Sequence, residues 1–254
     1  TGSGNDVIYG GPTTAEDPLD LGDLLQGRGG DDSIFGGGGD DVIRGDNGDD
    51  YIEGGIGDDR SLGGKGEDEI YGGQGLDDLF GGRGNDLLFG GGDADFLDGD
   101  TGSDTLYGGG GDDTINGGGG SDGDWLYGGS GNDLVEDGSG ASYLYGGLGN
   151  DTLEGGTGAD TYFGGLGDDY HIVNGNNNST IDTFVFSTGE GDDTIENFGV
   201  VEDLIDLTLF SLASFADVSL SSTADGGTLA SIGDITINFL DVDTADLDAS
   251  NFLI

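Results

Sequence analysis

Cysteine and methionine are both absent from this 254-residue sequence, and histidine occurs only once. Without thiols the chain has no disulfide bonds and no thiolate metal sites. A single histidine also excludes the paired histidines of the H-E-x-x-H zinc hydrolases. No stretch approaches the ~18 consecutive apolar residues of a membrane-spanning helix, and no signal-peptide pattern opens the chain. We therefore expect no membrane insertion, and we interpret the sequence, which starts without Met, as the C-terminal part of a longer or processed protein.

Positive charge is scarce: 5 basic residues stand against 53 acidic ones, which gives a formal net charge of −48. Such a chain is repelled by nucleic acids and by anionic membranes, so neither is an expected partner. Hydrophobic residues make up only 32% of the sequence. Few apolar residues and extreme charge are typical of disorder in water, unless a bound cation supplies the missing stabilisation.

Glycine, in contrast, is abundant, with 61 residues arranged in a nine-residue unit G-G-x-G-x-D-x-U-x, where U is apolar. Residues 81–98, GGRGNDLLFGGGDADFLD, are two such units in succession. Units begin at Gly27, Gly36, Gly45, Gly54, Gly63, Gly72, Gly81, Gly90, Gly99, Gly108, Gly128, Asp137, Gly146, Gly155 and Gly164. Residues 117–127 form a unit with two extra residues, and 10–26 span about two irregular units. A solvated linker would not keep an apolar residue two places after nearly every aspartate.

Each position of the unit has a physical role. The glycines allow positive φ and close backbone approach in a turn, and the D-x-U-x segment forms a short strand whose U side chain points inward. Two units then make one coil of 18 residues, so that position n stacks on position n+18. The predicted core is a thin ladder with Ile34, Ile52, Ile70, Leu88, Leu106 and Leu126 on one side, and Ile43, Leu79, Leu97, Ile115 and Val135 on the other.

The same stacking places aspartates above one another about 4.8 Å apart, where they repel unless a cation lies between them. Two carboxylates and the carbonyls of the glycine turns suit a hard cation with six to eight oxygen ligands. Magnesium requires a stricter octahedron and zinc prefers His or Cys, so calcium is predicted, at about 10–15 ions. The predicted ligands are Asp6, Asp23, Asp32, Asp41, Asp50, Asp59, Asp68, Asp77, Asp86, Asp95, Asp104, Asp113, Asp124, Asp133, Asp151, Asp160, Asp169, Asp182 and Asp193.

These repeats resemble the RTX nonapeptide, the haemolysin-type calcium-binding repeat, almost continuously over residues 1–172. The resemblance implies an all-β fold, a parallel β-roll (a right-handed β-solenoid) with calcium in its turns. It also implies export by type I secretion machinery and folding on extracellular calcium, hence a secreted or cell-surface location.

Some units depart from the pattern. Ser142 replaces the aspartate of its unit, so the two calcium sites that it would share are expected to be weak or empty. Ser61 takes the apolar position beside Leu62, which suggests a local slip or a core gap, and Asp93 replaces a glycine. The inserts at 10–20 and 117–127 are expected to bulge outward without ending the roll.

Beyond residue 172 the pattern changes, and we assign residues 173–254 to a second domain. Alternation in TLASI and ITINF, with a turn at Asp225-Gly226-Gly227, predicts antiparallel strands. This segment resembles the cap that closes many RTX proteins, including extracellular epimerases, lipases and proteases. The terminal Asn251-Phe252-Leu253-Ile254 resembles an uncleaved type I secretion signal, and it can equally pack as an edge strand.

No catalytic site is predicted. Gly119–Gly123 match G-x-S-x-G but lack the strand-to-helix context and the histidine of a nucleophile elbow. His171 is interpreted as a packing residue at the end of the roll. Trp125, Tyr107, Tyr127 and Tyr145 are more typical of a strand surface than of a sugar-binding strip.

The predicted function is a calcium-binding structural and secretion module. One alternative is a self-assembling surface-layer, adhesin or filament subunit that makes cell-surface or polysaccharide contacts. Another is the C-terminal module of a secreted hydrolase, epimerase or toxin with its catalytic domain upstream.

Overall fold

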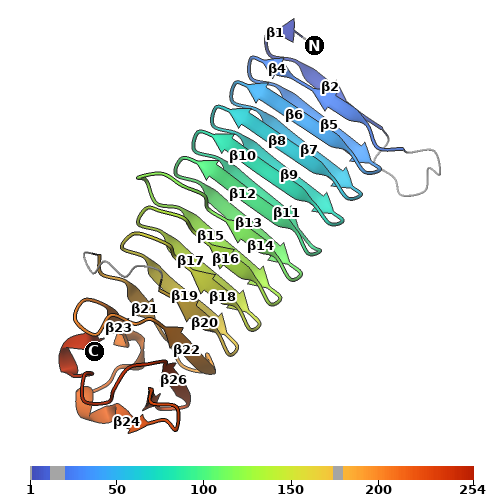
Figure 1. Ribbon diagram of the computed structural model, residues 1–254. Coiled ribbons are helices and arrows are strands. Elements are labelled where there is room, and N and C mark those ends of the chain that lie inside the picture. Colours follow the sequence, from blue (N-terminus) through green and yellow to red (C-terminus); the bar gives the residue numbers. More distant parts are fainter. Residues whose placement is uncertain (1, 12–20, 174–179) are drawn as a thin grey trace.

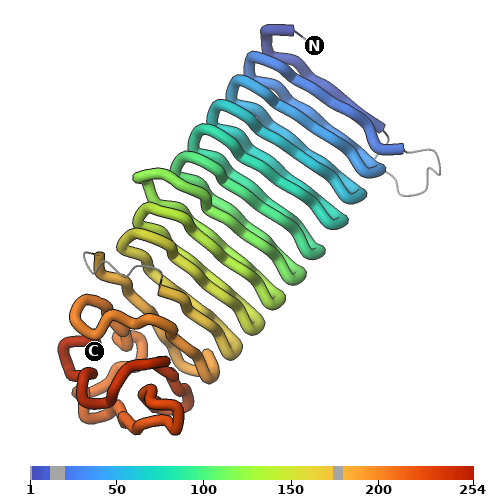
Figure 2. The backbone as a smooth tube through the Cα atoms, viewed as in Figure 1, coloured from blue at the N-terminus to red at the C-terminus, as the bar shows by residue number. Residues whose placement is uncertain are grey.

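The chain winds into an elongated stack of short strands that alternate between two sheets (Figure 1). This computed structural model describes residues 2–11, 21–173 and 180–254. The turns between the strands line both long edges of the stack (Figure 2). The predicted fold class is therefore confirmed as an all-β parallel β-solenoid with a small antiparallel region at its C-terminal end.

Within the described residues, the two large sheets have 12 and 13 strands. The first sheet contains, in spatial order, β2 (Val7–Tyr9), β5 (Ser33–Gly38), β7 (Tyr51–Ile56), β9 (Glu69–Gln74), β11 (Leu87–Gly91), β13 (Thr105–Gly110), β15 (Trp125–Ser130), β17 (Tyr143–Leu148), β19 (Thr161–Leu166), β21 (Thr183–Val185), β23 (Leu204–Asp206) and β27 (Phe252–Leu253). The second contains β3 (Leu24–Gln26), β6 (Val42–Asn47), β8 (Arg60–Lys65), β10 (Asp78–Arg83), β12 (Phe96–Thr101), β14 (Thr114–Asn116), β16 (Leu134–Glu136), β18 (Thr152–Glu154), β20 (Tyr170–Ile172), β22 (Asp192–Glu196), β26 (Ile235–Phe239), β25 (Thr228–Ile232) and β24 (Ser219–Ser222). A separate pair joins β1 (Gly2–Ser3) to β4 (Arg28–Gly29).

Neighbouring strands of the roll pair in parallel with a spacing of 18 residues, so that Leu88 is opposite Leu106. At the insert the spacing becomes 20, and Leu106 is opposite Leu126 without any break in pairing. The prediction that the 117–127 insert leaves the roll intact is confirmed. Of the first insert, residues 12–20 lie outside the described residues.

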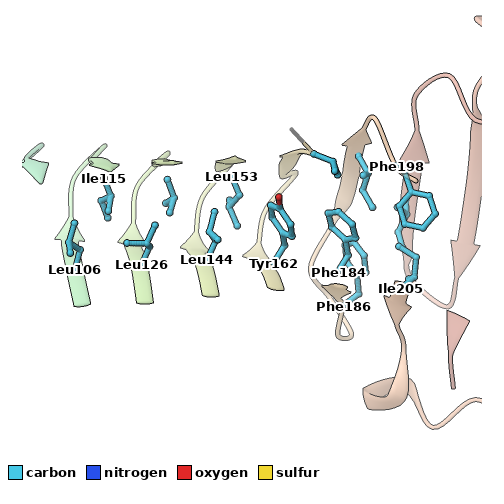
Figure 3. Close-up of a cluster of buried hydrophobic side chains, with 14 of the residues drawn as sticks. Leu106, Ile115, Leu126, Leu144, Leu153, Tyr162, Phe184, Phe186, Phe198 and Ile205 are labelled. Carbon is cyan, nitrogen blue, oxygen red and sulfur yellow. The ribbon is translucent and has the colours of Figure 1, made fainter. Parts of the chain in front are cut away.

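The core is a narrow column between the two sheets, with one side chain from each strand (Figure 3). All the core residues predicted from the repeat are fully buried, and the column continues through Leu144 and Leu153. Its side chains become aromatic at Tyr162, Phe184 and Phe186, where the roll approaches its C-terminal end. The Asp-x-U spacing therefore correctly predicts which face of each strand is buried.

Ser61 lies in register within this column, opposite Ile43 in one neighbouring strand and Leu79 in the other. The slip expected at this position is wrong, because strand pairing fixes the register through the residues on both sides of Ser61. Its side chain is fully buried and its hydroxyl has no hydrogen-bond partner. A buried hydroxyl without a partner destabilises the fold because it has lost its bonds to water.

Replacing this hydroxyl with a methyl group, in Ser61→Val, is expected to raise the free energy of unfolding by about 1–2 kcal/mol. Denaturation in saturating calcium measures the effect. Ser33→Val, at a half-buried position on the outer strand surface, is the control for the intrinsic preference of valine for strands. An equal gain in both variants would contradict this account of Ser61.

The parallel sheets continue past residue 172 through β21, β22 and β23. There β24, β25 and β26 add an antiparallel meander, with the predicted turn at Asp225-Gly226-Gly227 between β24 and β25. The short helices η1 (Thr208–Phe210), η2 (Phe215–Asp217) and η3 (Ala249–Asn251) lie in the same region. Phe252 is buried in β27, which forms the sheet edge beside β23, so the expectation of an edge strand is confirmed. The division into domains at residue 172 stays a prediction.

None of the helices in the described part of the chain is long and apolar enough to cross a bilayer.

Candidate metal-binding site

The turns of the roll stack closely on one another. Gly82 and Gly84, at the second and fourth places of their unit, have φ of 113° and 132°. A Cβ on Gly84 would lie 1.6 Å from the carbonyl oxygen of Gly66, in the turn one coil earlier. Only glycine fits such a contact, and this explains why glycine recurs in the turns.

At the end of each turn the aspartate bridges two coils. The backbone N–H of Asp50 donates to Oδ1 of Asp68 at 2.8 Å, and the N–H of Asp68 donates to Oδ1 of Asp86 at 2.8 Å. The first ladder of such bonds runs through Asp6, Asp32, Asp50, Asp68, Asp86, Asp104, Asp124, Ser142, Asp160, Asp182 and Asp203. The second runs through Asp23, Asp41, Asp59, Asp77, Asp95, Asp113, Asp133, Asp151, Asp169 and Asp193. All the aspartates predicted from the sequence belong to these two ladders.

The second oxygen of these carboxylates is buried and makes no hydrogen bond. This holds for Oδ2 of Asp32, Asp50, Asp59, Asp68, Asp77, Asp86, Asp95, Asp104, Asp113, Asp133, Asp151, Asp169 and Asp193. A buried anionic oxygen without a partner is strongly unfavourable, so these atoms require a cation or a proton.

These oxygens face a notch above the first glycine of the unit. A Cβ on Gly99 would lie 2.5 Å from Asp104 Oδ2 and 2.6 Å from the carbonyl oxygen of Gly117, in the next coil. The same two kinds of oxygen converge above Gly54, Gly72, Gly90, Gly108, Gly128 and Gly146. Each notch thus combines a carboxylate oxygen with a backbone carbonyl oxygen, and these are ligands that calcium prefers.

Burial raises the pKa of the ladder aspartates well above the ordinary value of 3.8. It raises the pKa of Asp68 and of Asp104 to about 7, against the opposing effect of the backbone N–H that each carboxylate accepts. The neighbouring carboxylates of the ladder add to the increase. Without a cation, therefore, ionising these groups is costly at neutral pH.

In the described ranges, no three acidic or histidine side chains converge on one point. A cation bound here would accordingly need backbone oxygens as well as carboxylates, as the sequence analysis expects. The Arg60–Asp78 ion pair, at 4.0 Å, lies on the surface, where both side chains are more than half exposed. This pair does not neutralise the buried ladders.

The sequence analysis missed several functional positions. Asp203 extends the first ladder, and the signal is the D-L-I spacing that it shares with the repeats. A further ladder lies on the outer rim, at the residue before each bridging aspartate, where the N–H of Glu67 donates to Oδ1 of Asp49 at 2.9 Å. The acceptors of this outer ladder are Asp31, Asp40, Asp49, Asp58, Asn85, Asp112, Asn132, Asn150 and Asp168. Its signal was the frequent Asp or Asn at place five of the unit.

Near the C-terminal end of the roll, a tyrosine fills one notch. The hydroxyl of Tyr162 accepts a hydrogen bond from Gly155 N at 3.1 Å and donates to the carbonyl oxygen of Ile172 at 3.3 Å. A Cβ on Gly155 would lie 2.4 Å from this hydroxyl and 2.7 Å from Asp160 Oδ2. A protein hydroxyl therefore takes the place beside the Asp160 carboxylate that a backbone carbonyl occupies in the regular notches.

His171 is buried among aromatic rings, in edge contacts with Tyr162, Phe184 and Phe186. Burial lowers its pKa to about 3, so the ring is neutral. The interpretation of His171 as a packing residue is confirmed.

On the outer surface of the first sheet, aromatic rings stack from coil to coil. The ring centroids of Tyr127 lie 4.6 Å from those of both Tyr107 and Tyr145. Trp125 stacks on Tyr143 at 4.3 Å, and these two side chains are 41% and 37% exposed. Stacking between coils supports the strand-surface interpretation of these residues, whereas sugar binding stays untested.

Comparison with protein-family models matches the RTX calcium-binding nonapeptide repeat at residues 1–12, 20–52, 53–88, 89–123, 119–148 and 136–170. These matches cover more than half of the chain, which therefore belongs to this family. The repeat is a structural, calcium-binding element rather than a catalytic one.

A search of curated proteins finds no match. Among solved structures, the extracellular lipase LipA from Serratia marcescens is similar, with 18% sequence identity and a TM-score of 0.38. The similarity covers 85% of this chain and 45% of the lipase, so the chain spans less than half of the lipase's length.

Proposed function

We propose that this chain is the calcium-dependent folding module of a secreted protein exported by a type I system. The observation that carries the proposal is the row of buried Oδ2 atoms, each without a hydrogen bond and each facing a backbone carbonyl oxygen across a notch. The residues that would hold calcium are the bridging aspartates of the two ladders, together with the carbonyls of the first glycine in each unit. About 10–15 ions would fill these notches.

The proposed mechanism uses the difference in calcium concentration across the cell envelope. Where calcium is scarce, the net charge of −48 and the unpaired buried carboxylates oppose the compact state. Extracellular calcium sites bind at about 10⁻⁴–10⁻³ M, so calcium outside the cell would fill the notches. Because calcium binds the folded chain only, each occupied site stabilises the fold by linkage.

The first test follows β structure by far-UV circular dichroism. In excess chelator at neutral pH we expect loss of most of the β-sheet signal, and titration with calcium should restore it cooperatively. Magnesium at equal concentration is the control and should restore much less, because it requires a stricter geometry. Full β structure that persists in chelator would contradict the proposal.

A single substitution makes this test specific to the notches. In Asp86→Asn, the amide oxygen can still accept from the N–H of Asp68, but the charge beside the notch is lost. The calcium concentration at the folding midpoint should rise, and the number of bound ions should fall. Asp78→Asn removes an equal charge from an exposed position and serves as the control. Identical behaviour of the two variants would argue against a calcium role for the ladder.

A further inference from the structure

The unit at residues 137–145 departs from the repeat at two places. Ser142 stands where a bridging aspartate is usual, and it is buried. Its Oγ accepts from Asp124 N at 2.9 Å, and its own N–H donates to Asp160 Oδ1 at 2.9 Å. The ladder of hydrogen bonds therefore continues through Ser142, but the anionic oxygen of this rung is missing.

The second departure is Asp137, at the first place of the unit, where the regular units have glycine. Its side chain is 5% exposed, and its Oδ2 accepts from Ser142 Oγ at 2.9 Å. Its Oδ1 is buried and has no hydrogen-bond partner.

The two departures depend on each other. In a regular unit, a Cβ at the first place would collide with the bridging aspartate of the same unit, as at Gly128, where Asp133 Oδ2 would lie 2.5 Å away. Serine is shorter than aspartate and leaves this space open. Asp137 occupies the space and returns a carboxylate to the rung from the opposite side of the turn.

The free oxygen of Asp137 points into the notch of the preceding coil. A Cβ on Gly117 would lie 2.7 Å from Asp137 Oδ1 and 2.7 Å from Asp124 Oδ2. In the regular notches, one carboxylate oxygen meets a backbone carbonyl oxygen; here, two carboxylates meet. Since more ligand charge raises calcium affinity, this notch should bind calcium more tightly than its neighbours.

We propose that Asp124 and Asp137 form a two-carboxylate calcium site at Gly117, built by moving the acidic residue from the sixth to the first place of the unit. This inference rests on the proposed calcium-binding function. It reverses the sequence-based expectation that the rung at Ser142 is weak or empty, because that expectation considered only the sixth place.

The test uses Trp125, the only tryptophan of the chain, which directly follows Asp124. Terbium serves as the calcium probe, with its luminescence excited through tryptophan, and calorimetry counts bound calcium. Asp137→Asn keeps an oxygen for Ser142 Oγ and removes the charge. We expect this variant to bind terbium near Trp125 about tenfold more weakly and to bind fewer calcium ions than the wild type. Asp122→Asn, at an exposed position in the neighbouring insert, is the matched control and should change neither readout.

A double variant guards against a folding defect in the single one. Asp137→Gly with Ser142→Asp recreates a regular unit, and it should recover the calcium ion with the affinity of an ordinary notch. Wild-type calcium binding with no difference between Asp137→Asn and Asp122→Asn would overturn this inference alone. A wild-type chain that binds no calcium would overturn both the inference and the proposed function.

Discussion

Acidifying the calcium-free protein from about pH 7.5 to about pH 5 is expected to increase its β-sheet content. The reason is the buried aspartate ladder. Burial raises the pKa of Asp59, Asp95 and Asp151 from 3.8 to about 7 in the folded chain. Between the ordinary and the raised value, the folded state binds more protons than the unfolded state, so stability falls as pH rises through this window. Protons therefore replace part of the missing calcium.

His171 has the opposite effect. Its pKa is lowered from 6.5 to about 3, so below pH 6.5 the unfolded chain binds a proton that the folded chain does not. This single residue acts against the many ladder aspartates whose pKa is raised, and the aspartates should dominate down to about pH 5. In saturating calcium the sign reverses, because protons then compete with the ion for the same carboxylates.

Circular dichroism in chelator across this pH range measures the effect, and the calcium-saturated protein provides the comparison. A steady loss of β structure on acidification in chelator would show that the ladder carboxylates are not buried in the folded, calcium-free chain.

Gly84→Ala is expected to lower the free energy of unfolding by more than about 3 kcal/mol. Two causes add at this position. The φ of 132° is unfavourable for any residue with a side chain, and the new Cβ would lie 1.6 Å from the carbonyl oxygen of Gly66. Since that oxygen belongs to the stacked backbone, the coil must separate from its neighbour to make room.

Gly92→Ala is the matched control for this effect. Gly92 lies in a turn of the same roll, but a Cβ there would meet no atom within 4 Å. Its substitution should change stability by less than about 0.5 kcal/mol. Denaturation of both variants in saturating calcium compares them, and an equal loss of stability would contradict the close stacking of turns at Gly84.

The sequence predicts the regular part of this molecule well because one spacing specifies several features together. The nine-residue period gives the coil length, and the residue two places after each aspartate gives the core, from Ile34 to Val135. It also places the bridging aspartates above one another. The calcium role of these aspartates stays a prediction.

The irregular part was harder to predict, because the outcome depends on contacts between coils. The slip expected at Ser61 does not occur, since the paired strands on both sides hold it in register. The role of Asp137 depends on the space beside Ser142, and a single-unit pattern does not contain that information. Likewise, the Tyr162 hydroxyl reaches the notch of Gly155 from a position at which the pattern indicates only an apolar side chain.

The one-residue-wide column of the core also bears on how such a molecule changes size. Each buried side chain from Ile34 to Leu153 contacts its counterparts in the adjoining coils, and every coil repeats the same cross-section. Gain or loss of one 18-residue period in this stretch would lengthen or shorten the rod while leaving its section and both ends as they are. Beyond Tyr162, the aromatic packing is unique to its place, and an equal deletion there would remove contacts that no other coil can replace.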